Sequence, residues 1–298
     1  MDSPAVQNRL KLATGLTFFV FCIEAAGGVI ANSLALISDA AHMLTDVASL
    51  VLAWSALKIA TRPSTDEKTF GYHRIETFAA LLNGLLLVFM ACGIFYESVQ
   101  RFQSPEVVQT QTVLIVALIG LLTNMGVLYF LKSPCHSTHD LNIKSAFYHV
   151  IGDTLASVGV IVGAAIMWAT GWYIVDAILG AAIAGLLLWG AKSILSESLH
   201  ILLEGVPRGI SLTEVKHALT AIPAVKDVHE LHIWSICSNI YALSTHVLLV
   251  NNQKVNQTES VLQDAHRVLE SQFNITHSTI QIESNPCSAA TNSCDIQH

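Results

Sequence analysis

Six long apolar runs dominate the sequence and constrain its fold more than any other feature. A helix needs about 20 apolar residues to cross the hydrocarbon core of a bilayer. Only 12% of the 298 residues are charged, about half of the fraction in soluble domains. We therefore expect six transmembrane helices, and the composition disfavours an ordinary soluble enzyme. The runs lie at residues 12–31, 34–58, 75–99, 110–131, 143–170 and 173–199.

The composition changes near Glu204, and the sequence beyond it is typical of a small α+β domain. Ser211 followed by Glu214 is a capping-box pattern, which marks the start of a helix. After this helix come two segments of strand-forming residues, one segment with helical spacing and a last strand-forming segment. This predicts the order α-β-β-α-β with the helices on one face of a sheet. The predicted elements lie at 211–221, 225–236, 241–250, 258–273 and 276–282.

The predicted domain organisation is a six-span transmembrane domain at 1–203, a ferredoxin-like α+β domain at 204–285 and a flexible tail at 286–298. Basic residues predict the orientation, because they concentrate in cytoplasmic loops. With the N-terminus inside, Arg101 is the only basic residue in the connectors on the outer side. Both termini and the α+β domain are then expected to be cytoplasmic. The basic residues on the inner side are Arg9, Lys11, Lys58, Arg62, Lys68, Arg74, Lys132, Lys144 and Lys192.

Two function classes are disfavoured by charge and motif content. The chain carries 15 Lys and Arg against 22 Asp and Glu, a formal net charge of −7. Nucleic-acid binding needs a basic surface, so we expect no nucleic-acid partner. The chain also lacks a GxxxxGK[ST] loop, so we expect no use of ATP.

Two identical His-x-x-x-Asp pairs lie inside apolar runs: His42 with Asp46, and His149 with Asp153. Residues four apart share one face of a helix. Ionisable groups within a span cost about 2.5–3.5 kcal/mol each and usually mark function. If the two faces meet, two imidazoles and two carboxylates suit tetrahedral Zn²⁺. The alternative is that these side chains only hydrogen-bond between helices.

Four further motifs are informative, at Ser33–Asp46, Thr69–Glu76, Leu202–Pro207 and Val228–Trp234. They resemble the cation diffusion facilitator family, and most closely its bacterial zinc, cadmium and cobalt efflux branch. The resemblance implies a homodimer in the bacterial inner membrane that exchanges metal for protons by alternating access. It also implies that the transport site, in a combination associated with Zn²⁺, is formed by His42, Asp46, His149 and Asp153.

The resemblance also implies a metal site in the cytoplasmic domain, on His229, His246, His277 and Glu283. His277 and Glu283 share a face of the last predicted strand, and alternation places His232 on the face opposite His229. Zn²⁺ is therefore expected both as transported substrate and as regulatory ligand, with no organic cofactor.

Other residues receive weaker assignments. Arg74 and Glu204 match a family ion pair, although two solvated charges are the alternative. His73 is a weak candidate for a metal site in the connector, because it is displaced by one position from the family pattern. Asp39 is a candidate for a proton or entry path, and Glu24 and Asp176 are expected to line the cavity or its rim.

Proton coupling follows from the ligand chemistry. An imidazole must be neutral to bind metal, and its ordinary pKa is about 6.5. Metal binding therefore displaces protons, and protons displace metal. A secondary transporter without catalytic residues is expected. The alternatives are another main substrate (Cd²⁺, Co²⁺, Mn²⁺ or Fe²⁺), a membrane-anchored metal sensor, or a metalloenzyme, although the His-Glu-x-x-His motif is absent.

Overall fold

A computed structural model of the chain describes most of the sequence. The backbone is described at residues 4–131, 141–237, 240–250 and 255–284. The side chains are described at residues 15–49, 51–126, 151–237, 240–250 and 258–284. The chain falls into two compact units, Met1–Leu52 with Leu82–Ile194, and Ala53–Leu81 with Leu195–His298.

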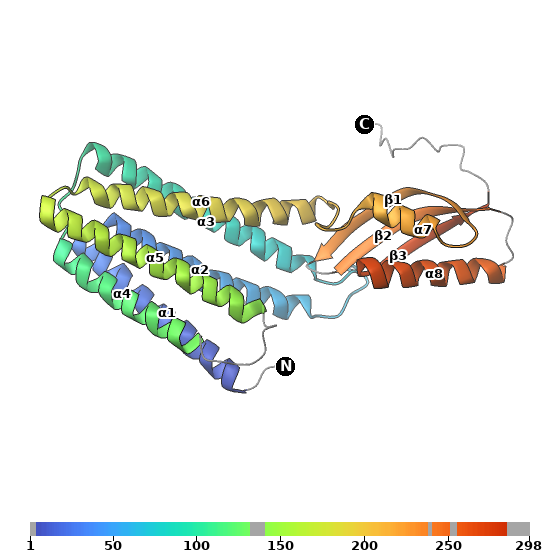
Figure 1. Ribbon diagram of the computed structural model, residues 1–298, viewed down its shortest axis with the longest axis horizontal. Helices are drawn as coiled ribbons and strands as arrows, with labels where there is room; N and C mark the ends of the chain where they lie inside the picture. The colour runs from blue at the N-terminus through green and yellow to red at the C-terminus, as the bar shows by residue number, and fades with distance from the viewer. Residues whose placement is uncertain (1–3, 132–140, 238–239, 251–254, 285–298) are drawn as a thin grey trace. The chain divides into compact units, whose positions relative to one another are not determined.

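Six long helices occupy the positions of the six apolar runs (Figure 1), which confirms the predicted helical membrane domain. Among the described residues, four helices are long and apolar enough to cross a membrane; the apolar parts of α1 and α4 described there are shorter. The helices are α1 (Pro4–Ala31), α2 (Leu34–Ala60), α3 (Arg74–Gln103), α4 (Thr110–Leu131), α5 (Leu141–Thr170) and α6 (Ile174–Leu202).

Large apolar side chains along these helices are exposed. Phe89 of α3 and Trp189 of α6 are each 78% exposed, and Trp168 of α5 is 67% exposed. Apolar surface of this extent is unfavourable in water, whereas lipid tails are as apolar as these side chains. The exposed faces are therefore the faces that contact the bilayer.

Small residues allow the helices of the first unit to pack closely. A Cβ atom on Gly27 of α1 would lie 2.6 Å from Val116 of α4, and one on Gly180 of α6 would lie 2.9 Å from Leu34 of α2. Two buried clusters form in this way. One joins α2 to α1, α4 and α5, and the other joins α2 to α3 and α6. The start of α2 is thus packed from both sides.

The C-terminal part has the predicted α-β-β-α-β order. The Ser211 hydroxyl accepts a hydrogen bond from the backbone N–H of Glu214 at 3.4 Å and caps the first helix. The three strands lie in the order β1-β2-β3; β2 is antiparallel to β1 and parallel to β3. The elements are α7 (Leu212–Thr220), β1 (Val225–Cys237), β2 (Ile240–Leu249), α8 (Val255–Phe273) and β3 (Ile275–Glu283).

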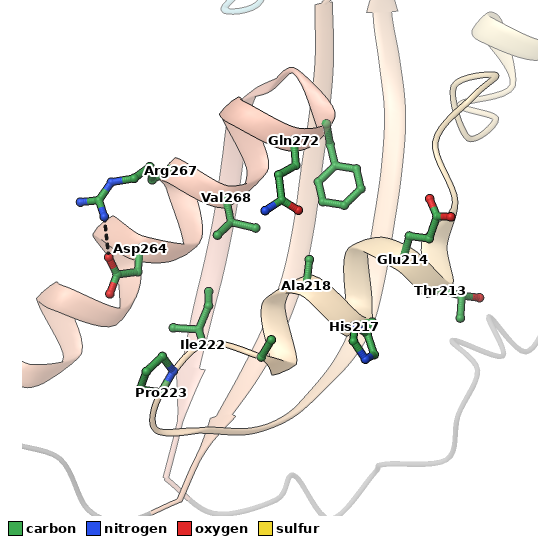
Figure 2. Close-up of a pocket in the computed structure, with 12 residues that line it drawn as sticks. Thr213, Glu214, His217, Ala218, Ile222, Pro223, Asp264, Arg267, Val268 and Gln272 are labelled. Carbon is green, nitrogen blue, oxygen red and sulfur yellow. Dashed lines mark hydrogen bonds and ion pairs between the residues drawn. The ribbon is translucent and has the colours of Figure 1, made fainter.

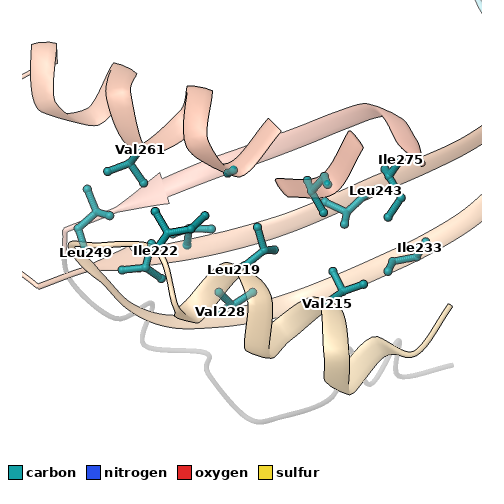
Figure 3. Close-up of a cluster of buried hydrophobic side chains, with 13 residues drawn as sticks. Val215, Leu219, Ile222, Val228, Ile233, Leu243, Leu249, Val261 and Ile275 are labelled. Carbon is teal, nitrogen blue, oxygen red and sulfur yellow. The ribbon is translucent and has the colours of Figure 1, made fainter. Parts of the chain in front are cut away.

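The core of this domain lies between the two helices and one face of the sheet (Figure 3). Leu219 of α7, Val228 of β1, Leu243 of β2 and Leu269 of α8 are at most 1% exposed. Apolar positions in the strands therefore point toward the helices, because successive side chains alternate between the faces of a sheet. The other face carries polar side chains, including His246 of β2, together with the buried Ala242 and Leu248.

A β-bulge in β1 changes which residues share that polar face. His229 pairs with His246 and His232 pairs with Ser244, so one extra residue lies between the two pairs. Glu230, within the bulge, has φ of 51°. Because of the bulge, His232 lies on the same face as His229. Simple alternation had predicted the opposite face for His232, and this prediction was wrong.

Leu243→Ala tests the described core. We expect it to reduce the free energy of unfolding of the α+β domain by about 2–5 kcal/mol, because it leaves a cavity. Leu212→Ala, at a side chain that is 40% exposed, should change this free energy by less than about 0.5 kcal/mol.

The thiol of Cys237 can report on unfolding. Burial, together with the Glu76 carboxylate, raises its pKa in the folded domain, so the folded thiol reacts slowly.

The measurement is alkylation of Cys237 in the purified full chain as urea increases, read by mass spectrometry. If both variants lowered the urea concentration at which Cys237 becomes reactive by the same amount, the assignment of Leu243 to the core would be contradicted.

Candidate metal sites

Two helices of the first unit bring three metal-ligating side chains together. His42 and Asp46 lie one turn apart on α2, and Asp153 lies on α5. One ligand atom from each lies within 4.8 Å of the other two, and His42 Nε2 is 3.7 Å from Asp153 Oδ1. His42 is 30% exposed and Asp153 13%. Mutually close nitrogen and oxygen donors of this kind are the ligands that Zn²⁺ and related cations bind.

The fourth expected ligand, His149, lies on the described backbone of α5, one turn before Asp153. Its side chain falls outside the described part of the chain, so its place as a ligand stays a prediction. Asp39 lies one turn before His42 on α2 and is 5% exposed. Its carboxylate interacts electrostatically with Asp46 and Asp153, which places it next to the cluster.

A second cluster lies on the polar face of the sheet. His229 of β1, His246 of β2 and Glu283 of β3 have ligand atoms within 4.8 Å of one another. Glu283 Oε2 is 3.2 Å from His229 Nε2, and Glu283 Oε1 is 3.0 Å from His246 Nδ1. These side chains are only 14%, 29% and 9% exposed, in strand order.

Three buried polar atoms of this second cluster make no hydrogen bond within the described part of the chain: His229 Nε2, His246 Nδ1 and Glu283 Oε2. Their close contacts are instead the approaches of Glu283 to His229 at 3.2 Å and to His246 at 3.0 Å. Potential ligand atoms gathered within 4.8 Å of one another have the chemistry of a cation site, since two imidazoles and a carboxylate are common ligands of zinc.

The expected participation of His277 in this site needs a correction. His277 shares the sheet face with Glu283, as predicted, but the two lie six positions apart along β3, or roughly 20 Å. In the sheet His277 pairs with Ala242 and Glu283 pairs with Leu248. The His277 ring instead contacts Phe70 edge-on, with centroids 5.4 Å apart. Alternation alone gave the face correctly but not the position along the strand.

The candidate ion pair is present in the second unit. Arg74 Nη2, at the start of α3, donates a hydrogen bond to Glu204 Oε1 at 2.9 Å. Glu204 lies just beyond α6 with φ of 59°. The side chains are 40% and 60% exposed, so solvent screens the pair and its contribution to stability is at most about 1 kcal/mol. If the pair has a role, that role is therefore the coupling of the two residues during transport and not the stability of the fold.

The remaining candidate, His73, lies in the turn before α3. It belongs to no group of three potential metal ligands among the residues whose side chains are described. The structure therefore gives this weak candidate no further ligands from those residues.

A groove of about 850 Å³ lies between α7 and α8 (Figure 2). Its polar side chains include His217 of α7 and an Asp264–Arg267 pair of α8, in which the N–O distance is 3.1 Å. No group of three potential metal ligands lies in it among the described residues. The groove is thus separate from the cluster of His229, His246 and Glu283, which lies on the other face of the sheet.

Together these observations define a membrane protein with one cluster of potential metal ligands between its helices and another on its α+β domain. Comparison with known families agrees. Residues 10–203 match the family described as the cation efflux transmembrane domain, and residues 207–285 match the cytoplasmic domain of cation efflux proteins. The chain belongs to this family: it is a bacterial-type cation efflux transporter and not an enzyme.

Several characterised proteins are similar over most of their length. The metal cation efflux system protein CzcD of Cupriavidus metallidurans is 43% identical over 97% of this chain and 90% of its own. The cadmium, cobalt and zinc/H(+)-K(+) antiporter of Bacillus subtilis is 38% identical over 88% of this chain and 84% of its own. The zinc transporter ZitB of Escherichia coli is 35% identical over 94% of this chain and 88% of its own.

One solved structure, the metal-bound C-terminal domain of the CzcD transporter, is 39% identical over 25% of this chain and 99% of its own, with a TM-score of 0.23.

A matched pair of variants tests the corrected site on the sheet. In an Asp153→Ala background, which removes a ligand from the membrane cluster, His246→Ala should weaken Zn²⁺ binding at least tenfold because it deletes a ligand. His277→Ala, on the same face of the sheet, should leave that affinity unchanged. Calorimetric titration of the purified chain with Zn²⁺ gives both values. A loss for His277→Ala equal to that for His246→Ala would contradict the three-residue site.

Proposed function

We propose that the chain is a proton-coupled exporter of Zn²⁺ that works by alternating access. The observation that carries the proposal is the convergence of His42, Asp46 and Asp153 from two membrane helices. His149 would complete the site from α5. Support comes from family membership and from relatives whose names state zinc transport and exchange with protons.

Each ligand has a distinct part in this proposal. Asp46 and Asp153 supply two negative charges, which balance the charge of the ion where the low dielectric makes an uncompensated charge costly. The imidazoles of His42 and His149 bind only when neutral, so each competes between proton and metal. Exposed to an acidic exterior, the site would release Zn²⁺ and take up protons; exposed to the cytoplasm, it would do the reverse.

The choice of Zn²⁺ rests on the mixed ligand set. Imidazole suits Zn²⁺, whereas sites built only from carboxylate and carbonyl oxygens suit Mn²⁺ and other hard ions. The relatives' names support Cd²⁺ and Co²⁺ as additional substrates. The alternative with Mn²⁺ or Fe²⁺ as main substrate has no comparable support from the described ligands.

The remaining assignments complete the proposal. The transport domain comprises residues 1–203, the cytoplasmic domain 204–285 and the tail 286–298. The chain is proposed to lie in the bacterial inner membrane as a homodimer with both termini in the cytoplasm. His229, His246 and Glu283 would bind a regulatory Zn²⁺, and Asp39 would serve the proton or entry path.

A metal sensor anchored by its spans is the second candidate. It would account for the cluster on the sheet, but it gives no reason for a ligand cluster between two membrane helices. An intramembrane metalloenzyme is not supported, because the chain lacks the motif that would supply a general base.

Proton release on binding tests the proposed coupling. Zn²⁺ binding should release protons and should weaken as pH falls from about 7 to 6, because protonated imidazole cannot bind metal. His42→Ala should lower the affinity and reduce this pH dependence. Calorimetry in two buffers of different ionisation enthalpy, between pH 5.5 and 8, gives the number of protons. Binding without proton release at any pH would exclude the antiport mechanism.

Selectivity tests the side chain of His149. His149→Asp makes the ligand set richer in oxygen, which favours harder or larger ions. We expect weaker discrimination against Mn²⁺ or Cd²⁺ while Zn²⁺ is still bound. The measurement is the ratio of transport rates for the three ions in vesicles at a fixed pH gradient. Unchanged ratios would argue against His149 as a metal ligand.

Charge reversal tests whether Arg74 and Glu204 act as a coupled pair during transport. Arg74→Glu should impair transport by placing two like charges together, and adding Glu204→Arg should partly restore it. A double-mutant cycle on the transport rate isolates the interaction from the separate effects. If the two defects simply add, the pair has no coupling role.

A further inference from the structure

A buried carboxylate on α6 holds the first turn of α2. Asp176 is 0% exposed and accepts three hydrogen bonds from residues 33–35. The donors are the Ser33 hydroxyl at 2.6 Å, the Leu34 backbone N–H at 2.5 Å and the Ala35 backbone N–H at 3.3 Å. The first N–H groups of a helix have no partner within the helix. Here a side chain from another helix supplies it.

A second charged residue holds the other side of the same turn. Arg101, at the end of α3, lies with Nη1 3.6 Å from Asp176 Oδ2. Its guanidinium also donates to the backbone oxygen of Asn32 at 2.7 Å and to the Asn32 side-chain oxygen at 3.0 Å. Asn32 forms the turn between α1 and α2 with φ of 53°. The start of α2 is therefore fixed to both α3 and α6.

Capping alone does not require this arrangement. Ser33 already provides a local cap for α2, because its hydroxyl accepts from the backbone N–H of Leu36 at 3.3 Å. A carboxylate from α6 adds what a local cap lacks, a fixed position of α2 relative to another helix. A carboxylate that contacts two successive N–H groups also restricts rotation of α2 about its axis.

We propose that Asp176 is a positioning residue for the transport site, which it sets through α2. The inference rests on the proposed function, because it takes His42 and Asp46 as ligands. His42 lies eight residues beyond Leu34, about 12 Å along the helix. Since a helix is stiff over this distance, the height and rotation fixed at its first turn determine where His42 and Asp46 meet Asp153. A site that discriminates between similar ions tolerates displacements of only about 0.5 Å.

The test compares Asp176→Asn with Glu106→Gln in the purified full chain reconstituted in bilayers. The reference chain and every variant of this test also carry His246→Ala, which removes a ligand from the cluster on the sheet, so that the measured Zn²⁺ binding is that of the membrane cluster. Asn keeps one acceptor oxygen but loses the charge and the second acceptor. Glu106 is a matched control, because its carboxylate also contacts this turn: it lies 3.6 Å from Arg101 and accepts a hydrogen bond from Asn32 Nδ2 at 2.8 Å. It is 54% exposed, however, and the backbone N–H groups of Leu34 and Ala35 donate to Asp176 instead. We expect Asp176→Asn to weaken Zn²⁺ binding at least tenfold and to change the ratio of Zn²⁺ to Cd²⁺ affinity. Glu106→Gln should change neither.

The readout separates positioning from general stability. If Asp176 only stabilises the fold, Asp176→Asn lowers the yield or thermal stability, but the folded fraction keeps the wild-type affinity and ion ratio, and the proposal is overturned. Should Asp176→Asn not fold, Ser33→Ala decides in the same assay: a smaller shift in the ion ratio supports the proposal, and no shift overturns it.

Failure of the proposed function gives a different pattern. In that case His42→Ala and Asp153→Ala also bind Zn²⁺ with wild-type affinity, and both the proposed function and the inference are overturned. Loss of binding in those two variants, together with wild-type affinity and ion ratio in Asp176→Asn, overturns the inference alone.

Discussion

The membrane domain depends on one constraint: an ionisable side chain inside apolar surroundings must have a partner or a ligand. Such groups are expensive within a span, and this chain places several there. Asp176 meets the constraint with three hydrogen bonds and a guanidinium. His42, Asp46 and Asp153 meet it by converging on a point where a cation would bind. The first arrangement holds helices together, and the second is the proposed transport site.

The same reasoning explains why much of the architecture could be predicted from the sequence. A span has no alternative to the helix, because lipid cannot satisfy a free backbone group, and so the six apolar runs led directly to α1–α6. The His-x-x-x-Asp spacing predicted which side chains share a helix face. Ser211 and Glu214 marked the start of α7 through a local interaction that the structure contains. Each of these signals is encoded within a short segment.

Features that depend on contacts between segments could not be predicted in this way. The bulge at Glu230 moved His232 to the face of His229, and no short-range signal in β1 marked it. His277 was assigned to a metal site because alternation fixes a face, whereas the register with β2 fixes the position along it. Asp176 was expected near a cavity or its rim. The three groups that donate hydrogen bonds to it lie more than 140 residues away in the sequence, beyond the reach of pattern analysis.

The central claim is that α2 and α5 carry a cation whose movement is exchanged for protons. It is tested most directly by Zn²⁺ flux in proteoliposomes that contain a zinc-sensitive dye, with and without an imposed pH gradient. We expect Zn²⁺ flux through the wild-type chain to be faster when the imposed gradient drives protons in the direction opposite to Zn²⁺. Asp153→Ala should abolish flux with and without the gradient. Flux that ignores the pH gradient, or that persists in Asp153→Ala, would contradict this claim.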